Sequence, residues 1–226
     1  TTPNVLVPLL LYLDLQDGQF PNAKEMHRGF HWLYAAQSWR RYTSQTGQRL
    51  EHDLSIVCNE SSPWSALCDC IIDQRGRIQV KAADLEGRGI KHPLHKMLAI
   101  VCKAHGAVDW FNGAPLGTVT GDSYDLHAHH IFARNLLYNT NYDSDNHVHR
   151  KVVNEIANRS LLTAESNMSL KDTPPAEYLP DIEGKFPGAL KNQFVPMKPD
   201  LWKVENYEKL ECHCWIVGWT KLKVEK

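Results

Sequence analysis

Three histidines are crowded into the short stretch "SYDLHAHHIF", at positions His127, His129 and His130. An imidazole is neutral near pH 7, so each of these side chains could bind a metal ion or accept a proton. Two asparagines follow in the sequence, Asn158 in "IANRSLL" and Asn167 in "ESNMSL". These side chains could serve one metal site, provided that the fold brings a histidine and an asparagine together.

The segments around these residues have the pattern of two strands and a helix. "SYDLHAHHIF" and "RSLLT" predict short strands, and the Asn- and Asp-rich "NTNYDSDNHVHR" between them predicts a loop. "AESNMSLK" predicts a helix with Thr163 as its N-cap and with Glu165 and Ser166 in its first turn. In such a ββα unit the first strand and the helix face each other across a small gap, so that one ligand from each can grip one metal ion.

The rest of the chain has mainly helical patterns. Apolar residues recur at helical spacing in "NAKEMHRGFHWLYAAQSWRRYT" and "HPLHKMLAIVCKAHG", and the glycine-rich "VDWFNGAPLGTVTGD" ends this region. "TPPAEYLP" predicts a proline-rich connector, and a final helix is expected from about Pro199 to Lys223. We therefore predict a mainly α protein, of the α+β class, with an embedded ββα unit.

Length and composition are typical of a globular protein. The chain has 226 residues, of which 42% are hydrophobic and 23% charged, so it can bury a sizeable core. We predict a helical region at 1–117, the ββα unit at 118–175, and a C-terminal helical region at 176–226 that packs back on the first. The formal net charge is -1, so binding to nucleic acid would depend on a local basic patch.

Several motifs, taken in their order along the chain, carry a family resemblance. "HHIF", "NEIANRSLLTAESN" and "PAEYL" resemble the HNH nucleases of the ββα-metal fold, in the H-N-N variant. More narrowly, the chain resembles the C-terminal nuclease region of the GmrSD-type modification-dependent restriction and phage-defence proteins. The resemblance implies that His130 is the general base and that Asn158 holds the loop and orients His130. It also implies that His129 and Asn167 bind the metal ion.

Two features leave the assignment of the ligands open. "DLHAHH" offers two registers, so His127 could bind the metal ion in place of His129, and the base would then change as well. Ala133 stands where the family usually has proline. Asp125 precedes His129 by four residues on the same face of a regular strand. About 13 Å of strand separates the two, so we expect Asp125 to support a histidine instead of binding the ion directly.

Basic residues around the unit are candidates for contacts with DNA phosphates. They are Arg134, Arg159 and Lys171. The simpler interpretation is that neighbouring carboxylates, such as Glu155 and Glu165, balance their charge.

The resemblance implies a metal-dependent endonuclease that hydrolyses DNA phosphodiester bonds, as the effector part of a bacterial restriction or anti-phage defence protein. We expect Mg²⁺ or Mn²⁺ as the cofactor, with Zn²⁺ or Ni²⁺ as alternatives. DNA, modified or not, is the expected partner. A nucleotide-using domain is expected to precede this region in the parent chain, a homodimer is compatible with the sequence, and the expected location is the cytoplasm, with no membrane partner. The alternatives are a non-catalytic DNA-binding or oligomerisation module with a relic ββα unit, or an RNase.

Overall fold

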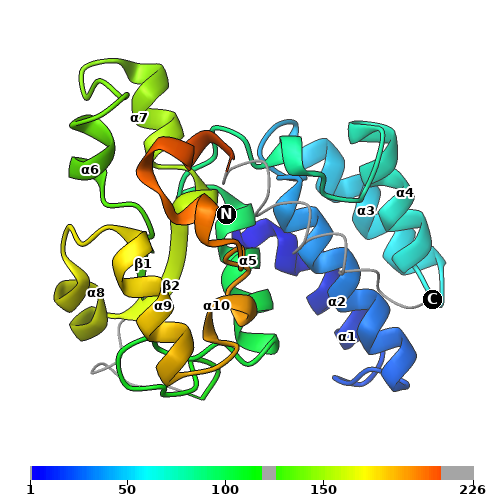
Figure 1. Cartoon of the computed structure of the whole chain (residues 1–226). Coiled ribbons are helices and arrows are strands. Elements are labelled where there is room, and N and C mark those ends of the chain that lie inside the picture. The colour runs from blue at the N-terminus through cyan, green and yellow to red at the C-terminus, as the bar shows by residue number, and fades with distance from the viewer. Residues whose placement is uncertain (1, 119–125, 210–226) are drawn as a thin grey trace. The chain divides into compact units, whose positions relative to one another are not determined.

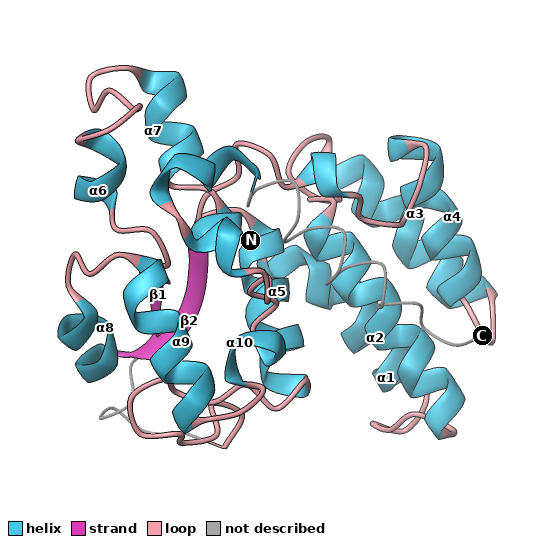
Figure 2. Ribbon diagram, viewed as in Figure 1, coloured by secondary structure: helices cyan, strands magenta, loops and turns pink. Residues whose placement is uncertain are grey.

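The computed structural model describes residues 2–118 and 126–209. It divides the chain into two compact units, Thr1–Gln79 and Val80–Lys226. This division lies earlier than the expected boundary after residue 117, and the second unit contains both the expected ββα region and the expected C-terminal region. Helices dominate the described residues, among which only two strands occur (Figure 2). None of the described helices has the length and apolar character needed to span a membrane.

The first unit is helical and has an aromatic core. Trp32 and Trp64 are fully buried with ring centroids 5.9 Å apart, and Tyr12 packs against Trp64. The elements of this unit are the 3₁₀ helix η1 (Pro3–Leu6) and the helices α1 (Val7–Asp14), α2 (Ala23–Ser38), α3 (Thr46–Asn59) and α4 (Trp64–Arg75). Helix α2 confirms the helix expected in "NAKEMHRGFHWLYAAQSWRRYT" from the spacing of apolar residues.

A buried ion pair fixes α3 within the first unit. The guanidinium of Arg41 donates two hydrogen bonds to the carboxylate of Asp53, at 2.8 and 2.6 Å. The hydroxyl of Tyr42 donates a third hydrogen bond to the same carboxylate, at 2.5 Å. Asp53 is fully buried, so its charge depends on these partners instead of on water.

The second unit contains the two strands and is built around them. Strand β1 (Leu126–His130) pairs antiparallel with β2 (Arg159–Thr163), and His130 lies opposite Arg159 in the register. The other elements are η2 (Ala82–Asp84), α5 (Pro93–Ala104), α6 (Arg134–Tyr138), α7 (His147–Val153), η4 (Ile156–Asn158), α8 (Ala164–Leu170), α9 (Pro175–Lys185), α10 (Ala189–Asn192), η5 (Pro199–Trp202) and η6 (Val204–Asn206).

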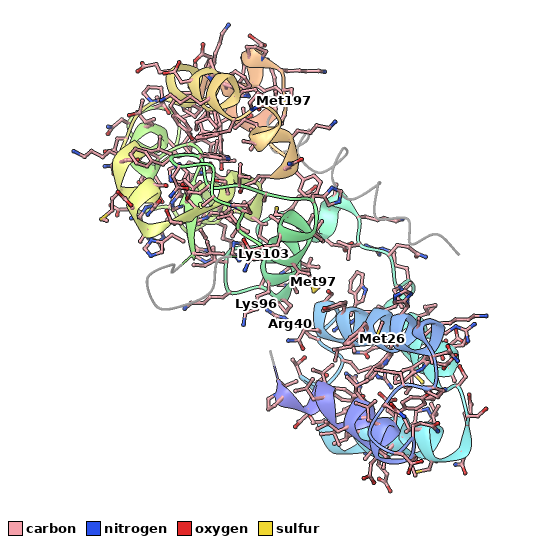
Figure 3. All side chains as sticks on the ribbon, turned by 90° about the horizontal axis from the view of Figure 1, so that it is seen from below. Met26, Arg40, Lys96, Met97, Lys103 and Met197 are labelled. Atoms are coloured by element: carbon pink, nitrogen blue, oxygen red, sulfur yellow. The ribbon has the colours of Figure 1, made fainter. Side chains whose placement is uncertain are left out.

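The two faces of the sheet are covered by different elements. Leu162 belongs to a hydrophobic cluster with residues of α9 and α10, whereas Leu161 belongs to a cluster with Leu94 and Leu98 of α5. Figure 1 shows the strands between α8 and α9 on one side and α5 on the other. Lys96 and Lys103 lie along α5 outside this cluster (Figure 3). The sheet is therefore held between two layers of helices.

Three expectations about individual elements need correction. The prediction of a connector at "TPPAEYLP" is wrong, because the segment from Pro175 onward forms the first turns of α9. Pro175 stands at the first helical position, which needs no N–H donor. The predicted loop "NTNYDSDNHVHR" contains the start of α7, capped by Asn146. The helix expected over residues 199–223 begins instead with η5 and η6, and its part beyond residue 209 lies outside the described residues.

Candidate active site

The alternation of side chains along β1 separates the three histidines. Its partners in β2 show that His127 and His129 share a face with Leu162, whereas His130 shares the opposite face with Leu161. The face of His129 is the one that α8 approaches, and His129 itself is buried with 5% of its surface exposed. The sequence "HAHH" thus sends imidazoles to both sides of one strand.

Asn167 of α8 reaches the two histidines that share a face. Its Oδ1 lies 2.9 Å from Nδ1 of His129, and its Nδ2 lies 3.4 Å from Nδ1 of His127. The helix begins as expected, because the side chain of Thr163 accepts a hydrogen bond from the backbone N–H of Ser166. The structure therefore brings a histidine of β1 and the amide of a residue in α8 within hydrogen-bonding distance. Of the two candidate histidines, His129 lies closer to Asn167 than His127 does.

A buried carboxylate holds the start of α8 in place. Asp109 accepts hydrogen bonds from the backbone N–H of Thr163 at 2.8 Å and from the hydroxyl of Ser166. It also accepts one from the backbone N–H of Phe111, at 2.9 Å. Burial opposes ionisation of Asp109, but these hydrogen bonds outweigh it and hold its pKa below the ordinary value. Asp109 thus connects the turn in which it lies, far earlier in the chain, to the start of α8, the helix that carries Asn167.

Aromatic rings surround His129. Trp110 and Tyr178 each meet its ring edge-on, with centroids 6.1 and 6.2 Å away. Burial lowers the pKa of His129 to about 4, against the opposing effect of its hydrogen bond with Asn167. The ring is therefore neutral near pH 7, which is the form that binds metal ions.

Asn158 is fully buried and holds the segment that follows β1. Its Oδ1 accepts a hydrogen bond from the backbone N–H of Phe132 at 2.7 Å. Its Nδ2 donates to the carbonyl oxygens of Phe132 and Val153, both at 3.0 Å. Asn158 thus holds both ends of the segment between the strands, at Phe132 before α6 and at Val153 in α7, as the resemblance implied. Among the described residues its side chain makes no hydrogen bond to His130.

His130 is held by two residues other than Asn158. Its Nε2 lies 3.1 Å from Oδ1 of Asn154, which can only accept a hydrogen bond, so Nε2 carries the proton. Its Nδ1 lies 3.1 Å from a guanidinium N–H of Arg159 and accepts from it. Burial, followed by the positive charge of Arg159, lowers the pKa of His130 to about 3. His130 is therefore a neutral imidazole of defined tautomer.

A cavity of about 170 Å³ opens beside these groups. Arg134 and Lys171 bring positive charge to it, and Asp172 is hydrogen-bonded to Asn135 at 2.9 Å. The lining residues are His129, His130, Ala133, Arg134, Asn135, Asn167, Lys171 and Asp172. Three of the expected site residues, His129, His130 and Asn167, thus meet at one cavity. Two of the expected basic residues, Arg134 and Lys171, line it as well.

The pair His129 and Asn167 fits a divalent metal ion. The 2.9 Å between Nδ1 and Oδ1 is a hydrogen-bond distance. The same two atoms would bind an ion once the imidazole proton is on Nε2 in place of Nδ1. Among the described residues no group of three or more His, Cys, Asp or Glu side chains forms a metal cluster. The site would therefore offer two neutral protein ligands and leave the other positions of the ion open.

Other expected site residues lie elsewhere or were not anticipated. Asp125 lies outside the described residues, and Arg159 contacts His130 instead of lining the cavity. Asn154 is the first residue of the quoted motif "NEIANRSLLTAESN", but the sequence suggested no role for it. Asp109 and Trp110 occur in the glycine-rich segment "VDWFNGAPLGTVTGD", which was expected only to end the helical region.

Comparison with known proteins adds no relative to this picture. No family model matches the chain, and no significant match was found among curated proteins or solved structures. The functional interpretation therefore depends on the geometry of the site and on the sequence motifs.

Proposed function

We propose that the chain is a metal-dependent endonuclease of the HNH type, in its H-N-N variant, that hydrolyses DNA phosphodiester bonds. The observation that carries this proposal is the approach of His129 Nδ1 to Asn167 Oδ1, at 2.9 Å, on the wall of a cavity that His130 also lines. The two groups come from a strand and a helix that follow one another in a strand–strand–helix arrangement. This supports a ββα-metal unit.

The chemistry assigns a task to each side chain. A divalent ion bound by His129 and Asn167 would stabilise negative charge on the phosphate and on the leaving oxygen. His130 takes a proton from water on a ring nitrogen, the water oxygen bonds to phosphorus, and the bond from phosphorus to the leaving oxygen breaks. The leaving oxygen then takes up a proton. Arg134 and Lys171 attract the phosphate to the cavity.

The cellular role belongs to the same proposal. A nuclease of this type would serve as the effector part of a bacterial restriction or anti-phage defence protein, acting in the cytoplasm. A nucleotide-using domain of the parent chain would regulate it, and a homodimer would allow both DNA strands to be cut.

Cleavage of supercoiled plasmid tests the proposal. With Mg²⁺ or Mn²⁺ we expect nicked or linear DNA, and EDTA should abolish the reaction. His130→Ala should lower the cleavage rate by at least about 100-fold, because general acid–base catalysis typically contributes that much, while circular dichroism shows an unchanged fold. His147→Ala is the matched control, since His147 is an exposed histidine of α7. An RNA of similar length, incubated in parallel, separates DNA cleavage from RNA cleavage.

Each outcome bears on a particular assignment. Metal-dependent cleavage that is as fast in His130→Ala as in the wild type would remove His130 as the base. DNA binding without cleavage under any of the metals would favour the non-catalytic binding module. Cleavage of RNA alone would make the protein an RNase.

A further inference from the structure

Arg159 is a buried cation without a carboxylate partner in the described part of the chain. Only 8% of its surface is exposed. Its three hydrogen bonds go to the carbonyl oxygen of Ala128, to Nδ1 of His130 and to Oδ1 of Asn154, all of which are neutral. Its Nε has no partner among the described residues. A buried guanidinium of this kind lacks a negative counter-charge, so binding of an anion would stabilise it.

The hydrogen bonds around His130 fix which nitrogen holds the lone pair. Asn154 Oδ1 accepts from Nε2 of His130 at 3.1 Å and from Arg159 at 3.0 Å, and Asn154 Nδ2 donates to the carbonyl oxygen of Arg150 at 2.8 Å. The lone pair is therefore on Nδ1, where Arg159 donates to it at 3.1 Å. In this arrangement the nitrogen that would take a proton from water is already occupied.

We propose that Arg159 caps the lone pair of His130 in the free protein, and that a phosphodiester oxygen of DNA replaces His130 as the partner of this guanidinium. The inference rests on the proposed function, because the anion is taken to be the substrate. Replacement frees Nδ1 to accept a proton from water. Asn154 is a positioning residue that keeps both Nε2–H of His130 and Arg159 in place during the exchange.

The charges favour this exchange over a permanent cap. The bond from Arg159 to His130 has a charged donor and a neutral acceptor, whereas a bond to a phosphate oxygen would join two opposite charges and add Coulombic attraction at a buried place. Only the bond to His130 has to be given up, since the bonds to Ala128 and Asn154 use other N–H directions. Arg134, which lines the cavity, places a second positive charge near the same point. The base would then become competent only when a phosphate is present.

Nitrogen NMR of the full chain, labelled with ¹⁵N-histidine and kept in EDTA, tests the proposal without any catalysis. In the free protein we expect a protonated Nε2 of His130 and the Nδ1 shift of a hydrogen-bonded lone pair. Arg159→Met should move that Nδ1 signal to the value of an unbonded lone pair. A short DNA duplex should move the wild-type signal away from its capped value, and it should not do so in Arg159→Met.

Two further variants make the test specific. Arg134→Met removes a cation of the cavity that makes no hydrogen bond to His130 among the described residues, so it should weaken duplex binding and leave Nδ1 of His130 hydrogen-bonded to Arg159 in the free protein. Arg159→Lys keeps the charge in case Arg159→Met does not fold. Because an ammonium lacks the planar fork, the lysine variant should show a largely uncapped Nδ1 and, by analogy with the loss of one positioned donor, a kcat about 100-fold lower.

The possible results separate this inference from the proposed function. Protonated Nδ1 in the free protein, or the same Nδ1 signal in the wild type and in a folded Arg159 variant, overturns the cap. A duplex that binds without moving Nδ1 overturns the exchange, and the nuclease proposal stands if that protein still cleaves plasmid. Absence of any duplex binding removes the exchange together with the proposed function.

Discussion

Both side chains that would bind the metal ion are neutral. His129 offers a nitrogen and Asn167 an amide oxygen. Among the described residues the carboxylate that lines the cavity is Asp172, and it is hydrogen-bonded to Asn135 and shares the cavity with the cations Arg134 and Lys171. Hard ions such as Mg²⁺ prefer charged oxygen ligands and keep several waters when few are available. A phosphate oxygen could supply both a ligand and the missing charge.

We therefore predict that Mn²⁺ binds weakly to the free protein and more tightly in the presence of a non-cleavable DNA duplex. Isothermal titration calorimetry with and without the duplex measures the difference in affinity for Mn²⁺. Asn167→Ala should abolish this difference. His147→Ala, an exposed histidine, serves as the control. Tight binding of Mn²⁺ without DNA that is lost in Asp125→Ala would show that a charged ligand had been overlooked.

Asn158 gives a second prediction at the scale of one side chain. Replacing it by alanine leaves a backbone N–H and two carbonyl oxygens without their partner in a buried place. Since each unsatisfied buried group is destabilising, we expect Asn158→Ala to lower the free energy of unfolding by about 3 kcal/mol. Urea unfolding followed by tryptophan fluorescence measures this.

A partial replacement separates the two functions of the Asn158 amide. Asn158→Asp keeps the acceptor for Phe132 N–H and removes the two donors, so we expect it to unfold at a urea concentration different from that of Asn158→Ala and to lose plasmid cleavage. Equal stability of the wild type and Asn158→Ala would contradict the assigned role of this residue in the loop.

At the scale of elements, the ion pair of the first unit determines the stability of α3. Asp53→Asn leaves the guanidinium of Arg41 buried without a counter-charge. Breaking a buried pair in this way typically destabilises a protein by about 3–5 kcal/mol. We predict that amide hydrogen exchange in α3 and α4 becomes faster by a corresponding factor. Glu51→Gln removes an exposed carboxylate from the same helix and should leave the exchange rates nearly unchanged; similar rates in Asp53→Asn would refute the prediction.

The sequence allowed β2 and the helix α8 to be predicted with nearly the observed limits, whereas β1 occupies only Leu126–His130 of the expected strand "SYDLHAHHIF". Alternation in "LHAHH", the β-rich "RSLLT" and the capping Thr163 are local signals, and each survived into the structure. Helix α9 was missed because prolines suggested a connector, yet Pro175 stands in the first turn and the apolar Tyr178 and Ile182 lie one turn apart and are buried. Tertiary burial outweighed the local signal there.

The candidate site was predictable only in part, for a physical reason. His129, His130, Asn158 and Asn167 stand in motifs of defined spacing, so their meeting could be expected. Asn154 could not be found in this way, because its contact with His130 depends on how the chain between the strands folds back. Long-range contacts of this kind leave no periodic pattern in the sequence.

At the scale of folding stability, Glu155 introduces a dependence on pH. This carboxyl is buried, and it accepts a hydrogen bond from the backbone N–H of Gly87 at 2.5 Å. Burial raises its pKa to about 7. Below its ordinary value of 4.5 the group is protonated in the folded and the unfolded states. Between that value and about pH 7 the unfolded chain loses the proton first, so folding becomes less favourable as the pH rises.

We therefore predict that Glu155→Gln matches the wild type at pH 4 and exceeds its stability at pH 8, by up to about 3 kcal/mol, because each unit of pKa difference corresponds to about 1.4 kcal/mol. Urea unfolding at both pH values provides the comparison. The exposed Glu208, replaced by glutamine, should show no such divergence. A Glu155→Gln protein that is less stable than the wild type at pH 8 would mean that this carboxyl is ionised in the fold.

The clamp formed by Asp109 limits what can be removed from the molecule. Helix α8 has seven residues, which is too short to persist in water by itself. Its first turn is fastened to a carboxylate that lies 57 positions earlier in the chain. A graft of the strand–strand–helix unit onto another scaffold must therefore include Asp109 or an equivalent hydrogen-bond acceptor. A transplant that starts at residue 118 would keep every motif residue and lose the anchor that aims Asn167.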